Sequence, residues 1–194
     1  MKKHIRFLLS LALCAALIVP ALATEPVVTY PIFTPRPAIA TNNTIVVSNS
    51  ADVPDAHVVR PAVYKIDGNN YFKLRDVAML LRGSEKEFSV EYDDESKSVT
   101  ITSGQPYAPL GSELTGAASD KAQAVFTNNT VFIDGEQVSL TVYKIDGANY
   151  FRLRDLAFAL DFCVSYDDGT KTVYISGARG YPEEDIAAVS GEDE

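Results

Sequence analysis

Residues 63–76 read Val-Tyr-Lys-Ile-Asp-Gly-Asn-Asn-Tyr-Phe-Lys-Leu-Arg-Asp, and residues 142–155 read Val-Tyr-Lys-Ile-Asp-Gly-Ala-Asn-Tyr-Phe-Arg-Leu-Arg-Asp. Only two of the fourteen positions differ, 69/148 and 73/152. The similarity continues upstream at Thr-Asn-Asn-Thr (41–44 and 127–130) and downstream at Tyr-Asp-Asp (92–94 and 166–168). Because such self-similarity marks a repeated structural unit, we expect a first repeat over residues 38–104 and a second repeat over residues 121–177.

Each repeat predicts the same elements in the same order. The Asp-Gly pair at 67–68 or 146–147 lies between β-prone segments, which is typical of a tight hairpin. The spacing of apolar residues then becomes helical and predicts one short helix, followed by a closing hairpin. The residues expected in the core stripe of these helices are Leu74, Val77, Ala78 and Leu81 in the first repeat and Leu153, Leu156, Ala157 and Leu160 in the second.

The fold class predicted from this pattern is α+β. We expect two tandem repeats, each a small antiparallel sheet of about five strands packed on one short α-helix. A unit of roughly 50–60 residues buries only about 60% of its extended-chain surface and is marginal alone. The two repeats are therefore expected to pack together or to share sheet edges.

The segments outside the repeats have distinct compositions. Residues 1–23 combine Lys2, Lys3 and Arg6 with an apolar run, which predicts a secretory signal peptide cleaved after Ala23. A retained anchor is disfavoured because the run is barely long enough to span a membrane and contains Pro20. Residues 24–37 are expected to form a Pro-rich linker, residues 105–120 a second linker, and residues 178–194 an acidic flexible tail. These features predict a secreted or extracellular protein, associated with the cell wall or free, that does not contact the membrane after cleavage.

The charge balance excludes some classes of partner. The 194 residues include 17 Lys+Arg and 26 Asp+Glu, for a formal charge of −9. Cleavage removes three basic residues and no acidic one, which leaves a charge of −12. A nucleic-acid-binding protein needs a clustered basic surface, so no nucleic-acid partner is expected.

Few side chains point to a chemical site. Cleavage leaves one histidine, His57, and one cysteine, Cys163. A Ser-His-Asp arrangement is therefore unsupported, and an intramolecular disulfide is excluded after cleavage. The Asp-Asp pairs at 93–94 and 167–168 lack the ligand spacing of a calcium loop and are interpreted as ordinary turns. We predict no catalytic residue, no metal site and no cofactor, and the protein is not expected to be an enzyme.

Two alternative sites stay open. Tyrosines recur in both repeats and form a candidate ligand-contact face for carbohydrate or peptidoglycan, although tyrosine also suits half-buried strands. The residues of this face are Tyr64, Tyr71, Tyr143 and Tyr150. A hydrolase that uses two carboxylates is the second alternative, because acidic residues are plentiful.

Three segments of the second repeat carry a resemblance to a known family. They are Thr-Val-Phe-Ile-Asp-Gly-Glu-Gln-Val-Ser-Leu (130–140), Asn-Tyr-Phe-Arg-Leu-Arg-Asp-Leu-Ala (149–157) and Val-Ser-Tyr-Asp-Asp-Gly-Thr-Lys-Thr-Val-Tyr-Ile (164–175). Together they resemble the copper amine oxidase N-terminal domain family, also called the stalk domain, which is common in secreted and surface proteins of Gram-positive bacteria. The resemblance implies a five-stranded antiparallel sheet wrapped on one helix and a spacer or interaction role. It implies no copper or quinone chemistry, because the Asn-Tyr pairs are followed by Phe72 and Phe151 rather than by an acid.

The sequence therefore predicts a secreted or cell-envelope, non-catalytic stalk or interaction module. Its expected partner is a protein or a cell-wall polymer. The oligomeric state is left open.

Overall fold

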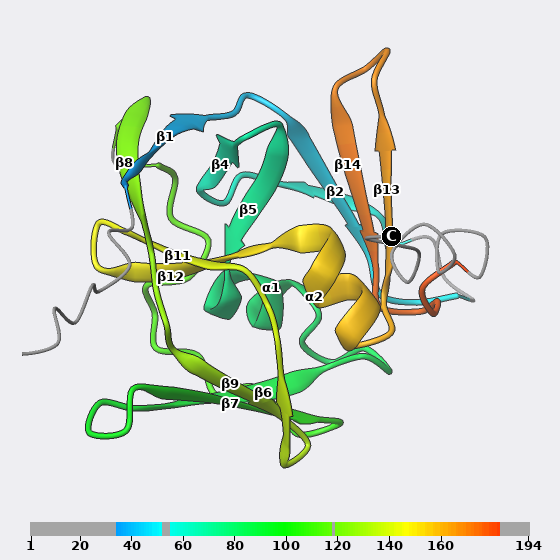
Figure 1. The fold of residues 1–194 in the computed structure, drawn as a ribbon. Helices are drawn as coiled ribbons and strands as arrows, with labels where there is room; N and C mark the ends of the chain where they lie inside the picture. Colours follow the sequence, from blue (N-terminus) through cyan, green and yellow to red (C-terminus); the bar gives the residue numbers. More distant parts are fainter. Residues whose placement is uncertain (1–33, 52–54, 118, 183–194) are drawn as a thin grey trace, which may run out of the picture. The chain divides into compact units, whose positions relative to one another are not determined.

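The computed structural model describes residues 34–51, 55–117 and 119–182 (Figure 1). The predicted signal peptide with its cleavage after Ala23, most of the Pro-rich linker and most of the acidic tail lie outside the described residues. Within the described ranges the chain forms fourteen strands and two helices. Among those residues there is no helix of the length and apolar character needed to cross a membrane.

The most similar part of the two repeats forms two equivalent hairpins. In the first repeat, β4 (Val63–Ile66) and β5 (Asn69–Lys73) are joined by Asp67 and Gly68, whose φ angles are 46° and 85°. In the second repeat, β11 (Val142–Ile145) and β12 (Ala148–Arg152) are joined by Asp146 and Gly147, at 48° and 84°. Two consecutive positive φ angles are characteristic of a type I′ turn, which explains the Asp-Gly pair at both sites.

These hairpins and two further strands close into a six-stranded barrel. The strand order is β1-β4-β5-β12-β11-β8, where β1 spans Arg36–Ala40 and β8 spans Lys121–Phe126. The hairpins meet where β5 pairs with β12, with Phe72 opposite Phe151, and the barrel closes where β1 pairs with β8. Small residues on β1 and β8 leave room for the aromatic rings inside. The buried residues of the barrel interior are Ala38, Ala62, Tyr64, Ile66, Tyr71, Ala124, Ile145 and Tyr150.

The helices and two four-stranded sheets pack outside the barrel. Helix α1 (Leu74–Leu80) follows β5, and helix α2 (Leu153–Ala159) follows β12. One sheet has the order β10-β9-β7-β6, and the other has the order β13-β14-β2-β3. The strand bounds are β2 Thr44–Ser48, β3 His57–Val59, β6 Phe88–Asp93, β7 Ser98–Ser103, β9 Thr130–Ile133, β10 Glu136–Val138, β13 Cys163–Asp167 and β14 Thr172–Ser176.

The main core lies between the barrel, the helices and these sheets. All eight apolar residues expected in the helix stripes are buried. They contact outward-facing barrel residues such as Phe72 and Phe151 and residues of both sheets, in one continuous apolar cluster. Figure 1 shows α1 and α2 near the centre of the molecule, with the sheet that contains β6, β7 and β9 below them and the sheet that contains β2, β13 and β14 at the upper right.

The two repeats exchange strands. Strand β2 of the first repeat pairs in parallel with β14 of the second, and β9 of the second repeat pairs in parallel with β7 of the first. The registers are equivalent, since Val173 lies opposite Ile45 and Val99 lies opposite Val131. Each sheet is therefore built from both repeats, and neither repeat contains a complete sheet of its own.

This arrangement corrects the predicted fold class. The expectation of two repeats, each an antiparallel sheet packed on one helix, is wrong, because the repeats share one closed barrel and two mixed sheets. The five-stranded sheet implied by the family resemblance is likewise not the fold observed. Repeats were expected to share sheet edges, and they do. Hydrophobic patterning identifies the strands and turns. The backbone groups at a strand edge are the same in every strand, so they do not specify which other strand it pairs with.

Candidate functional site

The candidate ligand-contact tyrosines lie in or against the barrel interior. Tyr64, Tyr71 and Tyr150 are each exposed by 5% or less, and Tyr143 is half-buried. The rings contact one another edge to face, with centroids 5.5 Å apart for Tyr64 and Tyr150 and 5.3 Å apart for Tyr71 and Tyr143. Burial raises the pKa of the Tyr71 hydroxyl to about 12. The four rings pack together as two pairs and do not form an exposed face. They therefore do not offer the exposed aromatic surface on which a sugar ring would stack.

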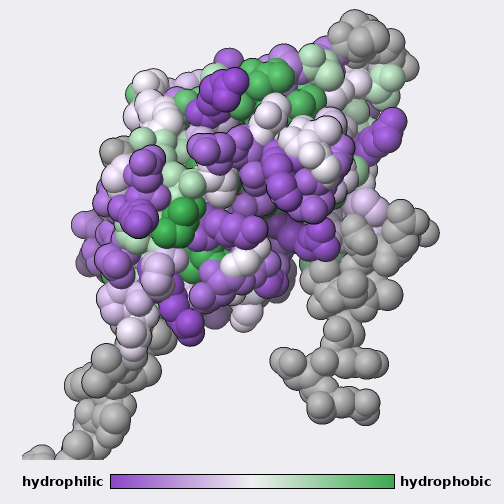
Figure 2. All heavy atoms as spheres, turned by 90° about the horizontal axis from the view of Figure 1, so that it is seen from above, coloured by the Kyte–Doolittle hydropathy of each residue, from purple (hydrophilic) through white to green (hydrophobic). Residues whose placement is uncertain are grey.

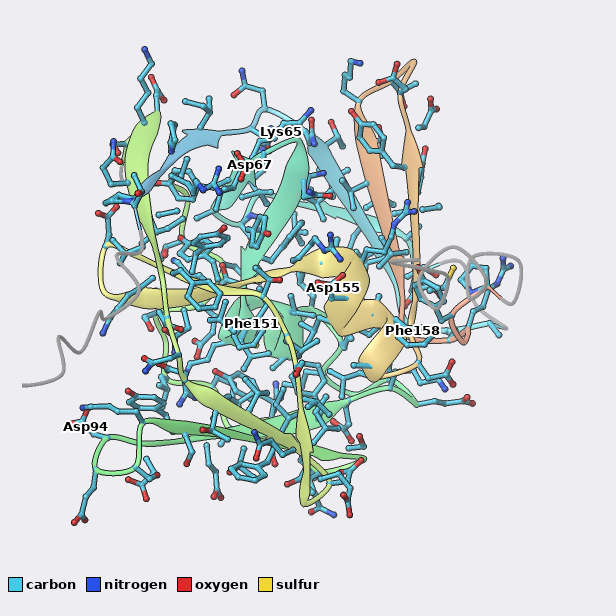
Figure 3. All side chains as sticks on the ribbon, in the orientation of Figure 1. Lys65, Asp67, Asp94, Phe151, Asp155 and Phe158 are labelled. Carbon is cyan, nitrogen blue, oxygen red and sulfur yellow. The ribbon has the colours of Figure 1, made fainter. Side chains whose placement is uncertain are left out.

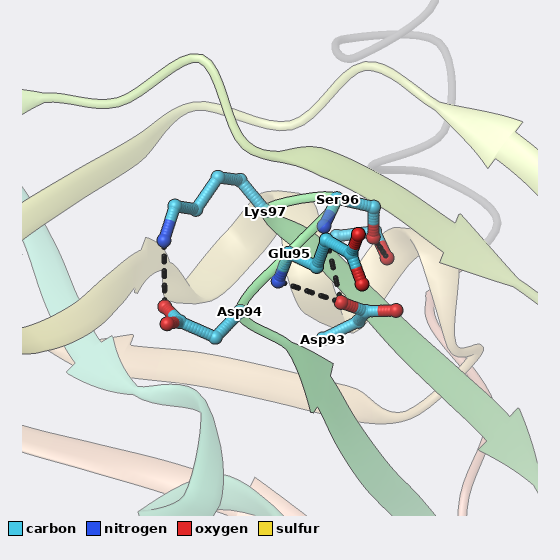
Figure 4. A network of polar contacts seen from close by, with 6 residues as sticks. Asp93, Asp94, Glu95, Ser96 and Lys97 are labelled. Carbon is cyan, nitrogen blue, oxygen red and sulfur yellow. Dashed lines mark hydrogen bonds and ion pairs between the residues drawn. The ribbon is translucent and has the colours of Figure 1, made fainter.

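The Asp-Asp pairs form ordinary turns of the closing hairpins. One carboxylate oxygen of Asp93 accepts hydrogen bonds from the backbone amides of Glu95 and Ser96, at 2.8 and 3.0 Å, and Lys97 pairs with Asp94 at 2.6 Å (Figure 4). These amide bonds lower the pKa of Asp93. The turn at 167–171 repeats the same contacts. Across the residues that the structure describes, no cluster of three or more His, Cys, Asp or Glu side chains is placed to hold a metal ion.

Two equivalent pockets lie at the first turns of the helices. The first pocket, beside α1, has a volume of about 450 Å³, and the second pocket, beside α2, has a volume of about 510 Å³. Their linings correspond position by position through the repeat. The equivalent pairs are Lys73 and Arg152, Leu74 and Leu153, Arg75 and Arg154, Asp76 and Asp155, Val90 and Val164, Tyr92 and Tyr166, Val99 and Val173, Lys144 and Lys65, and Asn149 and Asn70.

One wall of the first pocket is formed by the segment that connects the two repeats. Ser112, Glu113 and Thr115, from the segment between the repeats, line the pocket together with α1. The backbone amide of Leu114 donates a 2.9 Å hydrogen bond to Oδ1 of Asp76, and the Lys73 ammonium donates to Thr115 Oγ1 at 3.2 Å. Asp76 is only 1% exposed, and this burial raises the pKa of its carboxyl group. The carboxylate of Asp76 therefore binds the main chain of a looped segment, which we call the internal segment (residues 107–115).

The internal segment is held together by its own acidic residue. The Glu113 carboxylate accepts hydrogen bonds from the Tyr107 hydroxyl at 2.6 Å and from the amides of Leu110 and Gly111, both at 2.8 Å. Partial desolvation works against ionisation, but these hydrogen bonds outweigh it and lower the pKa of Glu113 to about 2. Leu114 has a φ angle of 57°, which is unusual for leucine, and its side chain packs against the main core. The segment is thus fixed by polar contacts at two positions and by an apolar anchor.

The second pocket differs because its aspartate has another partner. Arg152, which replaces Lys73, donates from Nε to Oδ1 of Asp155 at 2.6 Å and makes a second contact through Nη2. Figure 3 shows Asp155 on the first turn of α2 and Lys65 on the barrel hairpin. The cations that line the second pocket are Lys65, Arg152 and Arg154, and Asp155 is the one carboxylate among its lining residues.

The charges of the two pockets therefore differ. The first pocket has three cations, Lys73, Arg75 and Lys144, and they are matched by the carboxylates of Asp76, Asp94 and Glu113. The second pocket has an excess of two positive charges. The amide oxygen of Asn70, which lines the second pocket, is buried without a hydrogen-bond partner. An anionic or hydrogen-bonding group from another segment would match these features.

The surface near this end of the barrel is largely hydrophilic. Figure 2, seen from above the barrel hairpins, shows polar side chains with small separate hydrophobic patches between them. Lys65 and Arg152 were not identified as site residues from the sequence. The replacement of Lys73 by Arg152, one of two differences in the fourteen repeated positions, is the signal that marks the second pocket.

Comparison with protein-family models, with curated proteins and with solved structures finds no match for this chain. The resemblance to the stalk domain therefore rests on the residues that carry it in the sequence.

Proposed function

We propose that this chain is a non-catalytic interaction module of a secreted or cell-envelope protein, and that its second pocket binds an extended acidic segment of a partner protein. The observation that carries the proposal is the contrast between the two pockets. In the first pocket the first turn of α1 contacts a segment that contains Glu113, whereas in the second pocket Asp155 is bound by Arg152 and the lining residues have two unmatched positive charges. Extended segments with carboxylates are recognised elsewhere by arginine-rich sites of this kind.

The chemistry of the lining supports a peptide more than a sugar. Arg154 and Lys65 are exposed cations that line the pocket, while Arg152 is bound by Asp155. A guanidinium fixed by one carboxylate still has donors for a second, and it binds a planar carboxylate better than a hydroxyl group. The exposed ring of Tyr166 offers an apolar wall for the stem of a partner side chain.

Two features of the sequence support the location and the class. The predicted signal peptide supports export, and the resemblance to the stalk domain supports a spacer or interaction role. The overall negative charge disfavours binding of acidic partners at a distance, so selectivity has to come from the local cluster of cations. We therefore expect binding that is weak, short-ranged and sensitive to salt.

The test is fluorescence anisotropy with a labelled peptide that copies residues 108–117, which contain Glu113 and line the first pocket. Lys65→Glu should weaken binding at least tenfold, because it replaces one of three cations in the second pocket. Lys144→Glu, the equivalent change in the first pocket, is the matched control and should leave the affinity within twofold. A peptide with Gln in place of its Glu should bind more weakly to the unchanged protein.

The result that refutes the proposal is equal loss of binding in both lysine variants, or no binding at low salt. If an anionic polymer such as polyphosphate binds with the same dependence on Lys65 and the peptide does not, the partner is a polyanion rather than a protein segment.

A further inference from the structure

We infer that the first pocket binds a free amino acid with an apolar side chain, whose ammonium group donates a hydrogen bond to Oδ2 of Asp76. This site is separate from that of the proposed function, because it lies in the other pocket and takes a small molecule in place of a partner segment. Among the residues that the structure describes, this carboxylate oxygen is buried and has no hydrogen-bond partner.

Asp76 is a buried carboxylate with one satisfied oxygen. The residue is 1% exposed and lines the first pocket. Oδ1 accepts the hydrogen bond from the Leu114 amide at 2.9 Å, whereas Oδ2 accepts none from the described residues. Removing a carboxylate from water is costly unless the group is paired and hydrogen-bonded. A molecule in the pocket that brings a cationic donor to Oδ2 would therefore gain a strong contact and complete the pairing of this group.

The second repeat shows what the equivalent aspartate binds. There Arg152 donates to Oδ1 of Asp155 at 2.6 Å and forms an ion pair with it. In the first repeat the equivalent position is Lys73, whose ammonium group donates to Thr115 Oγ1 at 3.2 Å. The carboxylate that binds a nitrogen cation of the chain in the second repeat thus has a backbone amide as its donor in the first, and Oδ2 of Asp76 is left for a ligand.

The electrostatic surroundings of Asp76 favour an ammonium group at Oδ2. Burial is the main cause of the raised pKa of its carboxyl group, and the nearby charge of Glu113 raises this pKa further. The Leu114 amide and the charge of Lys73 act in the opposite direction. A cation at Oδ2 would offset both the burial and the repulsion. A metal ion fits less well, since within the described part of the chain no three His, Cys, Asp or Glu side chains are placed to hold one.

The remaining charges of the pocket match the carboxylate of an amino acid. Once an ammonium group pairs with the aspartate, the lining has three cations and two carboxylates, which is an excess of one positive charge. Those two carboxylates already have partners, since Asp94 pairs with Lys97 at 2.6 Å and Glu113 is bound by its own segment. Arg75 and Lys144 also line the pocket, and guanidinium and ammonium groups bind carboxylates through charge-assisted hydrogen bonds.

The apolar part of the lining indicates the side chain of the ligand. Leu74 and Val99 are buried, Val90 and Ala148 are partly buried, and the ring of Tyr92 is 41% exposed. An aliphatic side chain in contact with these residues would remove apolar surface from water. The volume of about 450 Å³ lies within the range of roughly 300–1,000 Å³ that is typical of small-molecule sites. Leucine is therefore a suitable probe.

The experiment is a titration of the full chain with L-leucine, followed by saturation-transfer NMR. The unchanged protein should give a saturable signal. N-acetyl-L-leucine lacks the ammonium group and should bind at least about tenfold more weakly, because a hydrogen bond to a buried charge is lost. L-leucinamide keeps the ammonium group but lacks the carboxylate, so it should bind at least about threefold more weakly.

Two variants and one matched control locate the site. Asp76→Asn keeps an oxygen for the Leu114 amide but replaces the free carboxylate oxygen by an amide nitrogen, so the affinity for leucine should fall at least about tenfold. Lys73→Arg retains the aspartate and supplies the guanidinium that Arg152 supplies in the second repeat, so it should also weaken binding. Asp155→Asn, the equivalent change in the second pocket, should leave the affinity within about twofold.

Loss of leucine binding in both first-pocket variants, with binding retained in Asp155→Asn, supports the inference. It is overturned if leucine does not bind, if either first-pocket variant binds leucine as tightly as the unchanged protein, or if Asp155→Asn loses as much affinity as Asp76→Asn. Equal binding of leucine and either of its two derivatives would also overturn it. The labelled 108–117 peptide tests the second pocket, so the proposed function and this inference can fail separately.

Discussion

Replacing Phe151 by Ala should destabilise both repeats together. Phe151 is 1% exposed, lies opposite Phe72 where the two barrel hairpins pair, and belongs to the main core (Figure 3). Removing a buried phenylalanine ring costs about 3–5 kcal/mol, against a total stability of about 5–15 kcal/mol for a domain. At about 2–4 °C per kcal/mol for a chain of this size, the melting temperature should fall by roughly 6–20 °C.

The assay follows each repeat separately. The chain contains no tryptophan, so a single tryptophan placed at Tyr92 or at Tyr166 reports on one repeat. These two positions are matched, at 41% and 42% exposure. Because β2 and β9 are exchanged between the repeats, Phe151→Ala should shift the urea midpoint of both probes by the same amount.

Phe158→Ala is the control in the same repeat. Phe158 is 39% exposed, so its loss should cost only about 1 kcal/mol. If the probe at position 92 keeps its midpoint while the probe at position 166 shifts, the repeats unfold independently and the exchanged-strand argument fails.

Two further predictions concern pH. Because the folded-state pKa of Glu113 is about 2, its stabilising effect is complete above the unfolded-state value of about 4.3 and disappears as the pH falls toward 2. Glu113→Gln should therefore lower the melting temperature at pH 7, by the equivalent of about 1 kcal/mol after solvent screening, and leave it unchanged at pH 2; equal losses at both values would contradict this. The folded-state pKa of Tyr71 is about 12, and burial raises that of Tyr150 as well, so stability present below pH 10 should be lost as the pH rises toward 12. The measurement is a pH titration that follows tyrosinate absorbance and circular dichroism together. If all the tyrosines ionise before the circular dichroism changes, the buried rings are accessible in the folded protein and the prediction is wrong.

Local structure could be read from the sequence because its causes are local. The Asp-Gly pairs at 67–68 and 146–147 predict tight turns, since glycine accepts a positive φ angle, and both form type I′ turns. The helical spacing of the apolar residues predicts the helices, and all the expected stripe residues are buried. Each of these predictions depends on residues within about eight positions of one another.

Strand pairing could not be read in the same way. Ile45 lies opposite Val173, and Val131 lies opposite Val99, in parallel pairs that join distant parts of the chain. Val and Ile suit any buried strand, so their presence does not distinguish a partner in the same repeat from one in the other. Similarly, Tyr64 and Tyr150 fit a half-exposed sheet as well as a barrel interior, and only closure of the barrel buries them.

The difference between the pockets arises from chain outside the repeats. The two repeats build nearly the same scaffold, with equivalent registers and equivalent lining residues. What differs is the segment that follows the first closing hairpin, together with two substituted lining positions, 69/148 and 73/152. At the second of these, Lys73 binds that segment and Arg152 binds the neighbouring aspartate. Exchanging Lys73 and Arg152, as Lys73→Arg with Arg152→Lys, should weaken the hydrogen bond between the Leu114 amide and Asp76 and should release Asp155 from its guanidinium partner.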